Sequence, residues 1–132
     1  MNKGTYLLLI KTEENINIII KKKEVLIEKG LYCYVGSAMK NLHQRVGRHI
    51  DYKSGKYNKH WHVDNLLEKG NVIFSVIIPD GIYREERISK KMSESFKSVK
   101  NFGASDLKVD SNLFIIENRN SFFDILKEIL NA

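Results

Sequence analysis

Arg45 and His49 are the two side chains whose types and spacing best suit chemistry on a phosphate group. They lie four residues apart in segment 39–52, which has helical periodicity, so they share one helix face. A guanidinium can give paired hydrogen bonds to two phosphate oxygens, and an imidazole can transfer a proton near neutral pH. The pair is therefore a candidate for a binding or catalytic role. The alternative for His49 is a polar residue that packs beside a strand.

Tyr6 and Tyr34 are candidate proton acceptors on two predicted strands. The period of two in segment 30–36 places Tyr32 and Tyr34 on one strand face and Cys33 on the other. A phenol has a reference pKa of ~10, so it accepts a proton near neutrality only where cationic neighbours lower that pKa. The alternative is that these aromatic rings pack in the core.

The histidines at His60 and His62 have a spacing that invites comparison with zinc sites. Residues at i and i+2 point apart on a strand or a helix, and the sequence has no second ligand pair with thiols. We therefore expect no zinc there. Together with Asp64, these histidines are candidates to support a site through hydrogen bonds or to contact nucleic acid.

The charge balance favours a polyanionic partner. The 132 residues include 22 Lys and Arg against 16 Asp and Glu, giving a net charge of +6, and the pI is near 9.4. Binding to phosphates releases counterions and favours basic proteins. A basic surface without a partner is the alternative, and the lysines of segment 21–24 suit either a solvated charged turn or a phosphate patch.

The cellular location predicted from the sequence is the cytoplasm. Cys33 is the single cysteine, so there is no internal disulfide and a reducing compartment suits the chain. No apolar stretch approaches the ~18 residues that a membrane helix needs, and residues 1–10 lack a signal-peptide cleavage pattern. We expect no contact with membranes.

The strands and helices that must position these side chains are predicted to form one domain over residues 1–132. Apolar runs and alternating patterns predict strands at residues 5–10, 17–20, 25–27, 30–36, 72–78 and 113–116. Helical patterns are found at residues 39–52, at 65–69, at 83–96 and at 122–130. Interleaved strands and helices with hairpin-like neighbours predict an α+β fold, with a small mixed or antiparallel central sheet flanked by helices.

Three local expectations follow from the same patterns. Leu42, Val46 and Ile50 recur every four residues and predict the inward stripe of the first helix. The β-branched segment 72–78 predicts a buried strand. Ser121, with an acidic residue three positions later, predicts the N-cap of the last helix.

Three motifs together resemble the signature of the GIY-YIG nucleases. GTY ends at Tyr6, YVGSA begins at Tyr34, and RVGRH runs from Arg45 to His49. A closer similarity is to the small branch of this superfamily, found alone or fused to endonuclease III-type repair glycosylases. The segments that match that branch are residues 4–6, 30–38, 60–64, the helix at Glu85, 102–106 and 111–114.

The chain differs from that branch near its last loop. Ala104, Leu107 and Val109 stand where the branch has cysteines, and Asn112 stands where a histidine is usual. We therefore expect no metal or redox role for this loop.

The resemblance implies a catalytic constellation with one divalent ion, Mg²⁺ or Mn²⁺. Tyr6 or Tyr34 would orient or deprotonate the attacking water, Arg45 would clamp the scissile phosphate, and His49 would assist. Glu85 would hold the metal, with Glu86 as a one-residue alternative. Without the resemblance, both glutamates would be read as solvated charges on an exposed helix face. The expected substrate-binding residues are Ser37, Lys40, Arg48, His60 and His62.

The predicted function is a metal-dependent endonuclease that hydrolyses DNA phosphodiester bonds, structure-selective and related to repair. The first alternative is a non-catalytic module that binds DNA or RNA and acts with a repair-protein partner. The second is a protein-interaction domain that uses the apolar face of helix 122–130.

Overall fold

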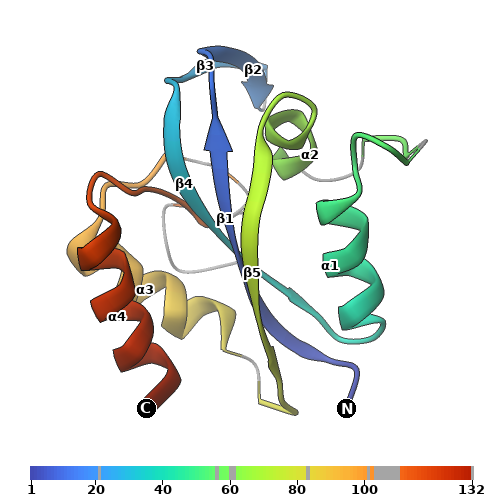
Figure 1. The fold of residues 1–132 in the computed structure, drawn as a ribbon, viewed down its shortest axis with the longest axis vertical. Coiled ribbons are helices and arrows are strands. Elements are labelled where there is room, and N and C mark those ends of the chain that lie inside the picture. The colour runs from blue at the N-terminus through green and yellow to red at the C-terminus, as the bar shows by residue number, and fades with distance from the viewer. Residues whose placement is uncertain are drawn as a thin grey trace.

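The centre of the protein is a four-stranded sheet (Figure 1). The computed structural model describes residues 1–20, 22–55, 57–59, 62–82, 84–100, 102 and 111–131. The strands lie in the order β5-β1-β4-β6, and every pair is antiparallel. Their bounds are β1 Gly4–Thr12, β4 Gly30–Ala38, β5 Asn71–Pro79 and β6 Leu113–Ile115. The predicted α+β class with an antiparallel sheet is confirmed.

Strand β1 is central, as its apolar run predicted. It pairs along its whole length with β4, from Gly4 opposite Ala38 to Thr12 opposite Gly30, and its other edge pairs with β5. Successive side chains of a strand point to opposite faces, and both faces here are covered. The run therefore has to be apolar on both sides.

A separate hairpin follows β1. Strands β2 (Ile16–Ile20) and β3 (Lys23–Ile27) pair antiparallel, which confirms the predicted pair of short strands joined by a charged turn. Lys22 in that turn has a left-handed backbone with φ of 66°. On β2 the buried residues alternate with exposed ones, so the hairpin adds one apolar face to the core.

Two pairs of helices cover opposite faces of the sheet (Figure 1). α1 (Leu42–Ile50) and α2 (His62–Leu67) contribute to one apolar cluster. α3 (Glu85–Ser95) and α4 (Arg119–Asn131) contribute to the other, where Ile88 and Met92 point inward as predicted. Among the helices of the described residues, none combines the length and apolar character that crossing a membrane requires.

The predicted inward stripe of α1 is wrong at its last member. Leu42 and Val46 are buried, but Ile50 is 55% exposed and His49 is buried instead. A step of four residues overshoots a turn of 3.6 residues by about 40°, so two such steps carry Ile50 out of the stripe. His49 lies seven residues after Leu42, close to two full turns, and so faces the core.

The predictions for β5 and for the start of α4 also need correction. β5 is an edge strand of the sheet, and its side chains are half-buried or exposed, with Ile73 43% exposed. α4 begins at Arg119, before the predicted cap. Asn118 Oδ1 accepts hydrogen bonds from the backbone N–H groups of Asn120 and Ser121. Asn118 therefore caps the helix, and Ser121 lies inside it.

Candidate active site

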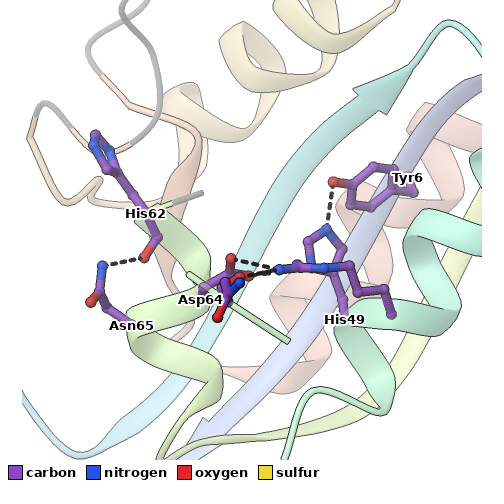
Figure 2. Close-up of polar contacts among 7 residues, drawn as sticks. Tyr6, His49, His62, Asp64 and Asn65 are labelled. Carbon is purple, nitrogen blue, oxygen red and sulfur yellow. Dashed lines mark hydrogen bonds and ion pairs between the residues drawn. The ribbon is translucent and has the colours of Figure 1, made fainter. Parts of the chain in front are cut away.

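A tyrosine of the sheet and a histidine of α1 form a buried hydrogen-bonded pair. Tyr6 Oη lies 2.9 Å from His49 Nε2 (Figure 2). Tyr6 stands opposite Gly36 on β4, where an added Cβ would lie 2.4 Å from the Tyr6 ring carbon Cζ. The glycine of the YVG motif thus makes room for the Tyr6 ring, which then reaches the buried face of α1.

Tyr34 completes an aromatic group around that pair. Its ring centroid lies 6.3 Å from that of Tyr6 and 6.4 Å from that of His49, and Phe102 meets it edge-on at 6.2 Å. Tyr34 is on the same face of β4 as Tyr32, as the sequence predicted, and Cys33 packs in the opposite cluster. The two tyrosines of the motifs therefore lie side by side.

Burial raises the pKa of both phenols. For Tyr6 the largest cause is desolvation, followed by the neighbouring Tyr34; the Arg45 guanidinium lowers the pKa by less. For Tyr34, desolvation and then the Glu85 carboxylate raise the pKa, again against Arg45. The cationic lowering that a phenolate base would need is therefore outweighed by burial. Both phenols are proton donors at neutral pH.

Glu85 enters the site from the first turn of α3. Its carboxylate accepts hydrogen bonds from Ser37 Oγ at 2.7 Å and from Asn112 Nδ2 at 3.0 Å, and the residue is 8% exposed. Glu86 is only half-buried and pairs with Lys90 at 3.3 Å, one turn further along the helix. Of the two glutamates, Glu85 is therefore the one that faces the motif residues.

Arg45 approaches the same point from α1. Its Nη1 donates a 2.6 Å hydrogen bond to the backbone carbonyl of Ser37. Because Ser37 Oγ also donates to Glu85, a single residue at the end of β4 joins the arginine of one helix to the carboxylate of another. The charges of both Arg45 and Glu85 act on the phenols of Tyr6 and Tyr34.

Two polar residues that sequence reasoning did not place in the site support Glu85. Ser89 Oγ donates to Asn112 Oδ1 at 3.2 Å, which leaves the amide nitrogen of Asn112 directed at Glu85. Ser89 and Asn112 are both buried. The available signal was the spacing of Ser89, which lies four residues after Glu85 and so shares its helix face. Asn112 was noted only as a departure from the family pattern.

Arg48 is anchored inside the fold. Its guanidinium gives two hydrogen bonds to Asp64, at 3.0 and 3.1 Å, and one of 2.8 Å to the carbonyl of Asn58. It also lies over the rings of Tyr52 and Tyr57, at 5.4 and 5.1 Å from their centroids. Arg48 was expected to bind substrate, and here its donors hold α1 to α2 and to the loop before α2.

His49 is held neutral. Burial lowers its pKa to about 4, while the Asp64 carboxylate raises that pKa and the Arg48 and Arg45 guanidinium groups lower it. The distance between His49 Nδ1 and Asp64 Oδ1 is 4.0 Å. At neutral pH His49 is therefore neutral, and one of its ring nitrogens is a hydrogen-bond acceptor.

Of the remaining expected substrate-binding residues, the structure describes Lys40 and His62. Lys40 is exposed in the turn between β4 and α1. His62 begins α2, and its ring meets Phe102 edge-on at 5.9 Å. His60 lies outside the described residues, as do Ala104, Leu107 and Val109 in the last loop.

Glu85 is the residue of this cluster that could hold a single Mg²⁺ or Mn²⁺. Within the described parts of the chain, no group of three or more His, Cys, Asp and Glu could hold a metal. Mg²⁺ in phosphoryl-transfer sites typically takes one or two carboxylates, several waters and the substrate phosphate. Glu85 supplies one carboxylate, and Ser37 Oγ and the Asn112 amide lie beside it.

Comparison with known proteins returns one family. The model of the family described as "Domain of unknown function DUF123" matches residues 5–132, which include every residue of the candidate site. No curated protein and no solved structure matches the chain significantly.

Proposed function

We propose that this chain, which belongs to the DUF123 family, is a metal-dependent endonuclease that cleaves DNA phosphodiester bonds. The observation that carries the proposal is the meeting of Arg45 and Glu85 at Ser37, beside the hydrogen-bonded pair of Tyr6 and His49. The similarity of the motifs to those of GIY-YIG nucleases supports it. These are the residues that this similarity assigns to the reaction.

Phosphodiester hydrolysis needs an activated water, positive charge on the phosphoryl oxygens and help for the leaving oxygen. Arg45 would bind the scissile phosphate, because its planar fork matches two phosphate oxygens. Glu85 would hold the divalent cation, which when bound supplies Lewis-acid charge to the same phosphate. A half-buried arginine and a buried carboxylate on either side of Ser37 would thus bracket one phosphate group.

Tyr6 would relay a proton and would not act as a free phenolate. Because burial raises its pKa, Tyr6 can take the proton of the attacking water only if it gives its own proton away. The group placed to accept it is His49 Nε2, which lies 2.9 Å from Tyr6 Oη. Tyr34, whose phenol is also protonated, would orient the water by a hydrogen bond.

The net charge of +6 supports binding to nucleic acid through its phosphates. Lys40 and His62, at the margin of the cluster, would contact the strand on either side of the scissile bond. We propose DNA as the substrate, with structure-selective cleavage related to repair and a repair protein as partner. RNA is the alternative polyanion.

The test is cleavage of labelled single-stranded, duplex, flap and branched DNA with Mg²⁺ or Mn²⁺. The parent protein should cleave at least one substrate, and Arg45→Ala, Tyr34→Phe and Glu85→Ala should abolish cleavage while salt-sensitive binding survives. Glu86→Ala is the matched control, because Glu86 pairs with Lys90 outside the cluster, and it should retain the parent rate. If Arg45→Ala cleaves DNA at the parent rate, the proposed nuclease site is wrong.

A non-catalytic DNA- or RNA-binding module is the second candidate. It is favoured by the hydrogen bonds that both Glu85 oxygens already accept inside the protein and by the raised pKa of both tyrosines. Such a module would bind with an affinity that falls steeply with salt, and it would show no cleavage with either metal.

A further inference from the structure

Asp64 lies on the side of the His49 ring away from Tyr6, and the proposed reaction so far gives it no role. Figure 2 shows the order: Tyr6 from β1, His49 from α1 and Asp64 from α2. Asp64 is fully buried, and its separation of 4.0 Å from His49 Nδ1 is too long for a hydrogen bond. Its carboxylate therefore acts on the ring through its charge, strengthened by the apolar surroundings.

A neutral imidazole carries one proton, on either Nδ1 or Nε2, and the two tautomers have opposite uses here. With the proton on Nδ1, an N–H faces the Asp64 carboxylate, and Nε2 has a lone pair for the Tyr6 hydroxyl. With the proton on Nε2, a lone pair faces the carboxylate, and Tyr6 loses its proton acceptor. The negative charge of Asp64 favours the first arrangement.

We propose that Asp64 is a positioning residue that holds His49 in its Nδ1-protonated tautomer, so that Nε2 can accept the proton of Tyr6. As the water oxygen bonds to phosphorus, the P–O bond to the leaving strand breaks and the leaving oxygen takes its electron pair. At the same time an O–H bond of the water breaks and a new O–H bond forms on Tyr6. The original Tyr6 O–H bond breaks and an N–H bond forms on His49 Nε2. His49 becomes an imidazolium, and the Asp64 carboxylate compensates its charge. The catalytic consequence rests on the proposed nuclease function, but the tautomer is a property of the protein alone.

Arg48 makes this arrangement rigid and also limits its strength. Its two hydrogen bonds fix both oxygens of Asp64, so the carboxylate cannot turn away from the ring. Its positive charge opposes the effect of Asp64 on His49, although the effect of Asp64 is the larger of the two. Burial therefore leaves His49 neutral at rest, while the carboxylate still biases the position of its proton.

The first test reads the tautomer directly by long-range ¹H–¹⁵N correlation in the ¹⁵N-labelled protein, with His49→Gln to assign the ring signals. In the parent, Nδ1 should carry the proton and Nε2 should be bare. Asp64→Asn should show a mixture, because it removes the negative charge that favours a proton on Nδ1. A proton on Nε2 in the parent, or an unchanged tautomer in Asp64→Asn, would overturn the proposal.

The second test separates positioning from folding. Asp64→Asn should lower kcat ~100-fold, the scale of a lost proton-transfer step, with KM changed less than about twofold. Arg48→Met combined with Asp64→Asn removes the buried pair together and should recover stability without recovering kcat. If the double variant recovers kcat together with stability, Asp64 has only a structural role and the proposal is wrong.

The matched control is Asp124→Asn, at an exposed position on α4, which should leave the tautomer, kcat and KM unchanged. If the parent cleaves no substrate with either metal, the nuclease assignment fails by itself. The ¹⁵N measurement then still decides whether Asp64 sets the tautomer of His49.

Discussion

The two faces of the central sheet differ in the kinds of side chain that they bury. The face beneath α3 and α4 is an apolar core, which includes Leu7, Leu9, Cys33, Val35 and Phe114. The face beneath α1 and α2 is also buried, but it carries phenols, an imidazole and a carboxylate among its aliphatic side chains. Because strand side chains alternate, β1 and β4 contribute to both faces at once.

This difference shows how a small domain can bury polar functional groups and still fold. Leu7 and Leu9 on one face of β1 contribute apolar burial, and Tyr6 on the other face contributes a hydroxyl with a partner. Polar groups that are buried without partners are costly, so the Tyr6 pair and the Asp64 pair have to be satisfied internally. The comparison predicts that mutations on the polar face change the cleavage rate, whereas mutations on the apolar face change stability alone.

The largest loss of folding stability should come from the polar face. Asp64→Asn removes the carboxylate from a buried ion pair, and breaking such a pair costs about 3–5 kcal/mol. Adding Arg48→Met should recover most of this loss, because it removes the cation that Asp64→Asn leaves without its countercharge. Urea unfolding of both variants measures the difference. An unstable double variant would show that the polar face depends on this ion pair for its fold.

Leu9→Ala should cost about 2–5 kcal/mol in the free energy of unfolding, because it opens a cavity in the apolar face. Its cleavage rate at temperatures where it stays folded should equal that of the parent, since Leu9 points away from the site. Chemical unfolding and a cleavage assay on the same sample give both quantities. A changed rate at full folding would mean that the two faces are coupled through β1.

The polar face should also give the protein a dependence on pH. The pKa of His49 is about 4, below its ordinary value of 6.5, so the unfolded chain takes up this proton first as the pH falls. The stabilisation is complete above pH 6.5 and is lost between pH 6.5 and about 4, a total of about 3 kcal/mol. His49→Gln should remove this dependence, and His43→Gln, at an exposed position, should keep it. Unfolding curves across this pH range provide the measurement.

Much of the fold could be predicted from the sequence, because it depends on local patterns. The apolar run of β1, the period of two in β4 and the inward Ile88 and Met92 of α3 appear directly in the sequence. The wrong predictions concern burial that depends on where an element lies in the fold. The sequence cannot show that β5 lies at a sheet edge, where one side has no neighbouring strand to cover it.

The site was predicted only in part, for a similar reason. Motif residues such as Arg45 and Glu85 were recognised from their order along the chain, and the structure brings both to Ser37. Asn112 was missed because it acts through contacts between distant segments, which no spacing reveals. Ser89 was also missed, although its spacing of four residues from Glu85 places both on one helix face. The pKa of Tyr6 was also beyond prediction, since it depends on burial more than on the neighbouring charge.

The smallest effect on stability should come from Tyr6→Phe. This variant best separates the effect on cleavage from the effect on stability. The ring is retained beside Gly36, so only the hydrogen bond to His49 is lost, at a cost of about 1 kcal/mol. The cleavage rate should nevertheless fall ~100-fold or more, because the proton relay from water to His49 is interrupted. Leu9→Ala on the same strand should show the reverse pattern, a large loss of stability with no change in rate. Unfolding and single-turnover cleavage of these two variants measure both effects. If Tyr6→Phe cleaves at the parent rate, Tyr6 takes no part in the reaction and its hydroxyl has only a structural role.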